Sequence, residues 1–253
     1  MSRISEFLKR IGLEGTKVEN SLEFLGKVQN ACVLTIPYEN LDILAGIPVS
    51  LKADDIFEKI VTNHRGGYCF ELNALLHAML SEMGFTVRSR FARYLRGEST
   101  VPFRRHRIVV VALDGEDYLL DIGVGQIAPR FPLKLSENLV QVQGEEAYKF
   151  EKDDELGWIL CDMYKGEWRR YICFTDDVQY EVDFEPASFW CEKHPESPFN
   201  KAPMLAIKTE KGRKSVDVDV YKVFEGEVLT EIKENLSEDE LREIYREHFG
   251  ISL

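Results

Sequence analysis

One segment constrains the fold more than any other: two consecutive glycines at positions 66 and 67 lead into a stretch with helical periodicity. The apolar residues that follow recur at intervals of three and four, at Leu72, Leu75, Leu76, Met79, Leu80 and Met83. This spacing predicts a helix that buries one face, and Gly84 suits a left-handed C-terminal cap. The glycines allow a tight turn before the helix. Cys69 therefore falls in the first turn of this helix, on or near its inward face.

The predicted position of Cys69 has chemical consequences. Unpaired N–H groups and the helix dipole favour an anion at a helix N-terminus, so a thiol there can be shifted towards the nucleophilic thiolate. A structural role is the alternative, because free cysteines are often buried as small apolar side chains. The preceding glycines and the polar neighbours Arg65 and Glu71 favour a functional thiol.

The composition is that of an ordinary globular protein and argues against several functions. With 44% hydrophobic residues among 253, the chain can bury a sizeable core without a disulfide or a metal. A net charge of −12 argues against a nucleic-acid binder. The five cysteines include no Cys-x-x-Cys pair, which leaves a zinc or thioredoxin-type site without support. There is no apolar run typical of a signal peptide or a membrane helix, so we expect a cytoplasmic protein with reduced thiols and no membrane partner.

The periodicity changes along the chain and predicts three regions. Helical patterns at about 2–12, 21–31, 54–63 and 69–83 fill a helical bundle over residues 1–84. Alternating patterns then predict strands at 86–94, 107–113, 118–122, 139–143, 147–151, 157–163 and 167–174, typical of a barrel or sandwich over 85–195. A short helix is predicted at 186–194. The last region, 196–253, carries predicted strands at 203–209 and 215–220 and a capped helix at 237–248.

A thiol nucleophile needs a base and a group that orients the base, and a predicted hairpin supplies both. Asp114-Gly115 between two apolar runs is a strong hairpin signal, and a two-residue turn there places Leu113 opposite Glu116. His106 and Asp121 then become diagonal neighbours on one sheet face, roughly 7–8 Å apart at the backbone. Asp121 has apolar neighbours and needs a hydrogen-bond partner. The spacing alone also fits a structural role for both residues.

Three stretches resemble one known family closely. They are residues 36–42 (IPYENLD), residues 65–73 (RGGYCFELN), and the pair at 106–107 (HR) followed by residues 118–125 (YLLDIGVG). Together they resemble the arylamine N-acetyltransferase family, and the likeness runs from the first helix to the end of the chain. The resemblance implies an α+β fold: an N-terminal helical bundle, a β-barrel and a C-terminal α/β lid, with a catalytic core like that of cysteine proteases and transglutaminases.

The same resemblance implies roles for individual residues. It implies a catalytic triad of Cys69, His106 and Asp121, and a structural ion pair between Arg65 and Glu39 near the site. The residues that it implies for binding substrate or coenzyme are Tyr38, Phe70, Gly123, Val124, Gly125 and Phe199. Without the resemblance, Arg65 would be taken as a solvated charge.

Two of these positions depart from the usual family pattern, and the coenzyme site stays open. The family usually has phenylalanine where this chain has Tyr38, and an aromatic residue where it has Val124. Valine leaves a wider pocket with less stacking on aromatic acceptors. Two basic clusters are candidates for the coenzyme phosphates, Arg104, Arg105 and Arg107 or Lys211, Arg213 and Lys214. Either cluster is alternatively a solvated face.

The resemblance implies acetyl-CoA as co-substrate, with no metal and no tightly bound cofactor. The acceptor would be a small aromatic amine, a hydrazine or an arylhydroxylamine, reached through an acetyl-cysteine with ping-pong kinetics. The expected assembly is a monomer or weak homodimer. The alternatives are an amide synthase or other acyltransferase with a longer or carrier-bound donor, a Cys–His–Asp amide hydrolase, and a catalytically silent ligand-binding protein. The intact triad argues against the silent protein.

Overall fold

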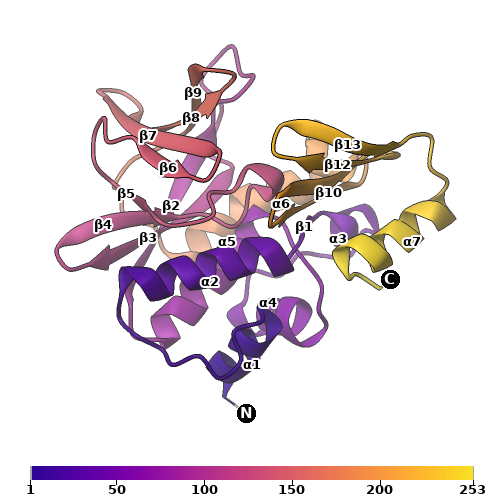
Figure 1. Ribbon diagram of the computed structural model, residues 1–253, viewed down its shortest axis with the longest axis horizontal. Coiled ribbons are helices and arrows are strands. Elements are labelled where there is room, and N and C mark those ends of the chain that lie inside the picture. Colours follow the sequence, from indigo (N-terminus) through magenta and orange to yellow (C-terminus); the bar gives the residue numbers. More distant parts are fainter. Residues whose placement is uncertain (1, 253) are drawn as a thin grey trace.

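Two antiparallel sheets flank a group of helices in the computed structural model, which describes residues 2–252 (Figure 1). The helical part comprises α1 (Arg3–Arg10), α2 (Leu22–Thr35), α3 (Leu41–Leu44), α4 (Ala53–Phe57), the π-helical turn η1 (Glu58–Thr62) and α5 (Cys69–Glu82). The predicted helices at 2–12 and 69–83 are confirmed. The last residue of the predicted lid, 253, lies outside the described residues. None of the helices in the described range is long and apolar enough to cross a membrane.

Two helices differ from their predicted bounds. The helix predicted at 21–31 continues to Thr35 and ends just before Pro37, which disfavours helical backbone at the residue before it. The helix predicted at 54–63 is α-helical only to Phe57 and continues as a π-helical turn. The apolar spacing did not reveal the change from α-helix to π-helical turn, because Ile56 and Phe57 in the first segment and Ile60 and Val61 in the second are all buried.

The apolar face of α5 forms the centre of the main core. Its residues Leu72, Leu75, Leu76, Met79 and Leu80 are at most 1% exposed and pack with buried side chains of α1, α2, β3 and the segment after β4. Full burial of each such side chain contributes about 1.5–3 kcal/mol. This packing fixes the axis of α5, and with it the position of Cys69 at the start of the helix.

The second region is an eight-stranded antiparallel sheet in the order β5-β4-β3-β2-β9-β8-β7-β6. Its strands are β2 (Thr86–Tyr94), β3 (His106–Leu113), β4 (Glu116–Leu120), β5 (Leu133–Lys134), β6 (Gln141–Gln143), β7 (Glu146–Asp153), β8 (Gly157–Tyr164) and β9 (Glu167–Phe174). Two glutamine side chains on β6 connect the two edges of the sheet. The side-chain amide of Gln141 accepts a hydrogen bond from the Lys134 N–H and donates one to the Lys134 carbonyl, and the side-chain amide of Gln143 does the same with Phe131, at 2.8–3.0 Å. The sheet is therefore a nearly closed barrel.

The predicted β3–β4 hairpin and its register are confirmed. Leu113 pairs with Glu116, and Val109 pairs with Leu120. Asp114 and Gly115 have φ angles of 52° and 81°, as a two-residue type I′ turn requires. His106 is the first residue of β3, and Asp121 directly follows β4.

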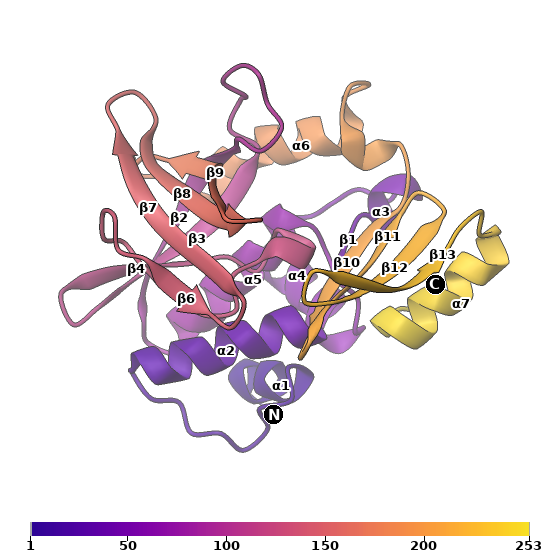
Figure 2. The ribbon, with the colours of Figure 1, turned by 45° about the horizontal axis from the view of Figure 1, so that its top comes forward.

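The C-terminal region holds a second sheet, in the order β1-β10-β11-β12-β13. Its strands are β10 (Met204–Thr209), β11 (Gly212–Asp217), β12 (Val220–Glu225), β13 (Val228–Lys233) and, from the N-terminal region, β1 (Tyr38–Glu39). One face packs on α7 (Glu238–Phe249), which is capped by Ser237 as predicted. The other face looks across at the barrel (Figure 2). The division at 84 and 195 stays a prediction.

The strand predicted at 215–220 is wrong, because it runs through a turn. Asp217 pairs with Val220, so Val218 and Asp219 form a two-residue hairpin turn. Val218 has a φ of 58°, a conformation that a β-branched residue rarely adopts, so the sequence carried no turn signal there. The last strand, β13, was missed because all its residues are exposed and it has no buried face to create alternation.

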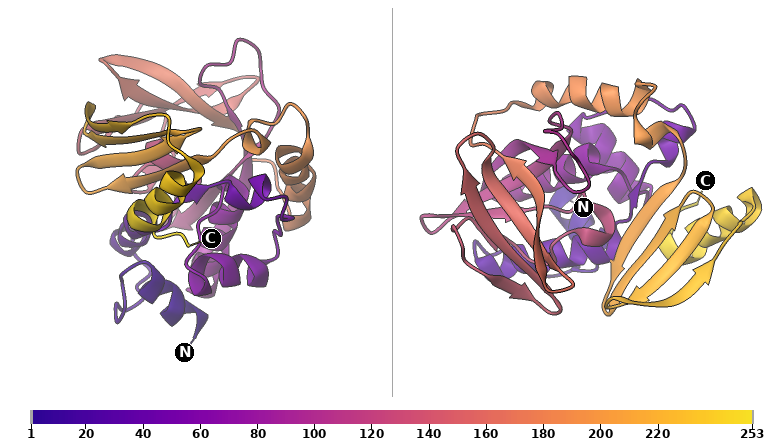
Figure 3. Two further views of the ribbon diagram at one scale, coloured as in Figure 1. Left: turned by 90° about the vertical axis from the view of Figure 1, so that its right-hand side faces the viewer. Right: turned by 90° about the horizontal axis from the view of Figure 1, so that it is seen from above.

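Short helical segments connect the barrel and the C-terminal sheet. They are η2 (Gly125–Ile127), η3 (Glu181–Phe184), α6 (Glu185–Lys193) and η4 (Pro198–Asn200). The view from above in Figure 3 shows α6 spanning from the barrel to the C-terminal sheet, with the N-terminal helices behind the space between them. The start of α5 therefore lies where all three regions meet.

Candidate active site

The nucleophile candidate Cys69 is the first residue of α5, and close backbone packing fixes the turn before it. A Cβ on Gly66 would lie 2.1 Å from the carbonyl oxygen of Pro37, and a Cβ on Gly67 would lie 2.9 Å from a Glu71 carboxylate oxygen. Neither glycine has a positive φ. The two glycines are therefore needed for close approach to their neighbours, rather than for an unusual backbone conformation.

The predicted contact between His106 and Asp121 is present. His106 Nε2 lies 2.7 Å from Asp121 Oδ2, and the two side chains are 5% and 1% exposed. His106 is placed by the start of β3 and Asp121 by the end of β4, as the hairpin register predicts. Because Asp121 occupies Nε2, the other ring nitrogen, Nδ1, is the one available to the thiol.

Asn73 is a site residue that the sequence reasoning missed. Its Nδ2 donates to Asp121 Oδ1 at 2.8 Å and to the Arg107 carbonyl at 2.6 Å, and its Oδ1 accepts from the Ile122 N–H at 3.0 Å. It is fully buried. A sequence signal existed, because Asn73 lies four residues after Cys69 and so on the same face of α5. The amide fixes the Asp121 carboxylate against the nucleophile helix.

The prediction that the helix start favours a Cys69 thiolate needs correction. Burial raises the pKa of the Cys69 thiol well above its ordinary value, and this outweighs the lowering by backbone hydrogen bonds from Arg107 and Phe70. A lone thiolate is therefore disfavoured here. A thiolate at this position therefore needs a neighbouring cation, and His106 lines the same pocket as Cys69.

A network of charges anchors the loops before α5. The predicted ion pair is present, with Arg65 Nη2 at 2.8 Å from Glu39 Oε1, and Asp42 also contacts Arg65 at 2.9 Å. Lys59 joins Asp42 at 2.8 Å to Glu71 at 2.7 Å. Burial alone would lower the pKa of Lys59, but the three surrounding carboxylates raise it above its ordinary value. The network ties β1, η1 and the first turn of α5 together.

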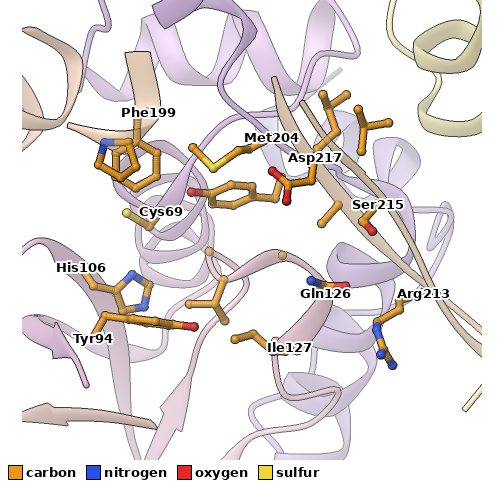
Figure 4. A pocket seen from close by; sticks show the side chains of 18 of the residues that line it. Cys69, Tyr94, His106, Gln126, Ile127, Phe199, Met204, Arg213, Ser215 and Asp217 are labelled. Carbon is orange, nitrogen blue, oxygen red and sulfur yellow. The ribbon is translucent and has the colours of Figure 1, made fainter. Parts of the chain in front are cut away.

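Cys69 and His106 line a pocket of about 540 Å³ between the barrel and the C-terminal sheet. Of the residues predicted for binding, Tyr38, Gly123, Val124, Gly125 and Phe199 line the same pocket. Gly123 is required by packing, since a Cβ there would lie 2.8 Å from Cys69 Cα. Figure 4 shows Cys69, His106 and Phe199 at one end of the pocket and Gln126, Ser215 and Arg213 at the other.

Phe70, also predicted for binding, does not line this pocket. Its side chain is fully buried, and its ring lies 5.6 Å from that of Tyr68, 6.2 Å from Phe184 and 6.4 Å from Phe91. It points away from the pocket because it is the next residue along α5 after Cys69, about 100° around the helix. Phe70 supports the helix start from behind.

The two predicted basic clusters separate in space. Arg107 is fully buried against Glu181, and Arg104 pairs with Asp177 away from the pocket. Arg105, the third member of the first cluster, lines the pocket and pairs with Glu98 at 2.9 Å. From the second cluster, only Arg213 lines the pocket. Two neighbours that the sequence did not single out, Ser215 and Lys222, line the pocket with it.

A thiol at a helix start, beside a buried histidine–carboxylate pair and open to a pocket, defines a thiol-dependent acyltransferase or amide hydrolase. A family model described as N-acetyltransferase matches residues 21–253. A protein of Mycolicibacterium smegmatis named arylamine N-acetyltransferase is 35% identical over 215 residues, which cover 82% of this chain and 77% of that protein. The chain belongs to the arylamine N-acetyltransferase family.

Solved structures agree with this assignment. The arylamine N-acetyltransferase from Salmonella typhimurium superposes with a TM-score of 0.94 at 26% identity, covering 99% of this chain and 92% of that one. The Mycobacterium marinum arylamine N-acetyltransferase in complex with CoA gives a TM-score of 0.91 at 28% identity, covering 98% and 92%. The predicted fold class is therefore confirmed.

Proposed function

We propose that this enzyme takes an acetyl group from acetyl-CoA onto Cys69 and passes it to an arylamine, a hydrazine or an arylhydroxylamine. One observation carries the proposal: the Cys69 thiol shares a pocket with His106, whose Nε2 is held 2.7 Å from a buried Asp121 carboxylate oxygen. That arrangement leaves Nδ1 as a proton acceptor for the thiol.

In the first half-reaction, His106 Nδ1 takes the thiol proton, and the Cys69 sulfur attacks the thioester carbonyl carbon. The carbonyl electron pair moves to oxygen and forms a tetrahedral oxyanion, which N–H groups at the start of α5 are placed to stabilise. When this electron pair re-forms the carbonyl double bond, the bond between the carbonyl carbon and the coenzyme sulfur breaks. The imidazolium returns its proton to the departing thiolate, and acetyl-Cys69 remains.

In the second half-reaction, the acceptor nitrogen or hydroxyl oxygen attacks acetyl-Cys69. His106 takes the proton that the acceptor loses, and the Cys69 thiolate leaves beside the imidazolium. Asp121 stabilises the imidazolium in both halves without itself taking a proton. Val124 lines this pocket without an aromatic ring, so we expect flat acceptors to gain less stacking there than from an aromatic residue.

We place the coenzyme phosphates on the polar end of the pocket, at Arg213, Ser215 and Lys222. Ser215 and Lys222 are cross-strand partners, and Arg213 lies two residues before Ser215 on the same sheet face. Lys222 makes no ion pair with any residue from 2 to 252, so its charge is free to meet an anion. The CoA complex of the Mycobacterium marinum relative supports a coenzyme ligand for this fold.

Removing these cations should weaken coenzyme binding. In Arg213→Ala combined with Lys222→Ala, we expect the KM for acetyl-CoA to rise by about 10-fold or more, since one charged hydrogen bond contributes roughly 1.5–3 kcal/mol. Steady-state kinetics with a saturating acceptor measure this, and kcat should change less than KM. Lys214→Ala is the matched control, because Lys214 lies between these residues in sequence but lines none of the pocket. An unchanged KM would show that the coenzyme phosphates bind elsewhere.

The proposed function predicts an isolable intermediate. When the protein is mixed with acetyl-CoA and no acceptor, intact mass spectrometry should show a gain of one acetyl group, and adding an arylamine should remove it. Consumption of acetyl-CoA without an adduct would indicate hydrolysis. If neither adduct nor consumption appears, the donor is a different one, such as a longer or carrier-bound acyl group.

A further inference from the structure

We propose that the Tyr38 hydroxyl donates a hydrogen bond to the acetyl oxygen at Cys69 and stabilises the oxyanion in both half-reactions. This inference rests on the proposed acetyl-Cys69 intermediate. It concerns a side chain at a position where the resembled family usually has phenylalanine. The hydroxyl is therefore an addition to the backbone N–H groups at the helix start, rather than a replacement for them.

The backbone of Tyr38 is held beside the turn that leads into Cys69. On one side, β1 pairs with β10, with Tyr38 opposite Ala206. On the other side Tyr38 forms a bridge with Gly67, in which the Glu39 N–H donates to the Gly67 carbonyl at 2.9 Å and the Gly67 N–H donates to the Pro37 carbonyl at 3.3 Å. Hydrogen bonds on both edges fix Tyr38 relative to the nucleophile.

The Tyr38 side chain is confined as well. A Cβ on Gly125 would lie 3.4 Å from Tyr38 Cβ and 3.5 Å from its Cγ, so the loop after β4 passes directly over the base of the ring. The side chain also packs against the cluster that contains Tyr68 and Cys69. A ring held in this way loses little further freedom when it binds a ligand, which is the condition for a preorganised donor.

The Tyr38 hydroxyl is free to act as a donor. It has no hydrogen-bond partner among residues 2–252, and Tyr38 lines the pocket. Other tyrosines differ: the Tyr68 hydroxyl bonds Ser188, and that of Tyr171 is sealed from solvent. Burial raises the pKa of Tyr38 well above its ordinary value, and a Cys69 thiolate raises it further, more than any other charge nearby. The phenol therefore stays protonated, and Tyr38 lines the same pocket as the Cys69 thiol.

The chemistry of acetyl transfer gives such a donor a defined task. In both half-reactions, the developing charge sits on the oxygen of the carbon bonded to the Cys69 sulfur. A phenol in the same pocket that donates to this oxygen strengthens its hydrogen bond as the charge grows. No proton is transferred to or from Tyr38.

Tyr38→Phe tests the inference, because it removes one oxygen atom and keeps the ring. The rates of Cys69 acetylation by acetyl-CoA and of deacetylation by an arylamine should both fall, by similar factors of about 10- to 100-fold. Rapid-quench intact mass spectrometry measures both rates. The acceptor-side decrease should be the same for an arylamine and a hydrazine, because the affected oxygen belongs to the acetyl group.

Tyr118→Phe is the matched control, because its ring lies on β4 outside the pocket, and both rates should stay at the wild-type value. If Tyr38→Phe slows only deacetylation, the hydroxyl recognises the acceptor and the inference is overturned. Unchanged rates in Tyr38→Phe overturn it too. Failure of the wild-type protein to gain an acetyl group would instead refute the proposed function itself, so the two failures are distinguishable.

Discussion

Cys69→Ser should gain no acetyl group from acetyl-CoA, and its kcat/KM for acetyl transfer should fall by about 10⁴-fold or more. The hydroxyl is a much weaker nucleophile than a thiolate, and in this buried position its ionisation is even less favourable than that of the thiol, whose pKa burial already raises. Intact mass spectrometry and steady-state kinetics measure the two effects. Acetyl-CoA binding, followed by calorimetry, should remain.

Cys32→Ala is the control for this experiment. Cys32 is also fully buried, and burial raises the pKa of its thiol to about 12, but it lies on α2 away from the pocket. We expect this variant to be acetylated once, like the wild type. Acetylation of the Cys69→Ser variant to the same extent would place the nucleophile on another residue, and retained turnover would remove Cys69 from the mechanism.

Asp121→Asn should slow Cys69 acetylation by about 10³- to 10⁴-fold, because it places the imidazole proton on the wrong nitrogen. Asp121 Oδ1 accepts hydrogen bonds from Asn73 Nδ2 and from the Gly123 N–H, both at 2.8 Å. Both neighbours are donors, so the amide oxygen must take that position and the new NH₂ must face His106. His106 Nε2 then accepts, its proton moves to Nδ1, and Nδ1 no longer takes the thiol proton.

The Asp121→Asn variant should also show a changed pH dependence. Because burial raises the pKa of the Cys69 thiol, a thiolate forms without the base only at alkaline pH. The residual acetylation rate of Asp121→Asn should therefore increase as pH rises. Rapid-quench mass spectrometry across a pH series measures this.

Asp117→Asn is the control for Asp121→Asn, because it makes the same substitution on β4. Asp117 forms an ion pair with Arg88 in which both side chains are 39% exposed. The control substitution should leave the acetylation rate unaltered, since exposed ion pairs contribute little. If the Asp121→Asn variant is acetylated at the wild-type rate with unchanged pH dependence, Asp121 has only a structural role.

Local patterns predicted the His106–Asp121 contact well because it depends on short-range rules. The Asp114-Gly115 turn fixed the hairpin register, and the register placed His106 beside Asp121. The apolar spacing after Cys69 fixed the face of α5. In each case a turn or a helical repeat determines the structure within a few residues, so no knowledge of distant contacts was needed.

The rest depended on tertiary contacts that sequence spacing does not encode. Burial reversed the expected pKa shift of Cys69, and the extent of burial comes from packing between regions. The pocket face at Ser215 and Lys222 depends on a hairpin turn at Val218, whose positive φ no local signal marked. Asn73 lies on the Cys69 face of α5, but its partners Asp121 and Ile122 follow β4, and helix spacing alone does not predict that contact.

The two residues of β1 have a consequence for how this chain holds together. One edge of β1 completes the C-terminal sheet through Tyr38 and Ala206, and the other edge meets Gly67 at the entrance to the nucleophile helix. Separation of β10 from β1 breaks backbone hydrogen bonds of a strand whose other edge is bonded to Gly67, two residues before Cys69. We therefore expect local opening of that sheet to be coupled to loosening of the backbone beside Cys69. Amide hydrogen exchange at Glu39, Gly67 and the β10 backbone should consequently proceed with a common opening free energy.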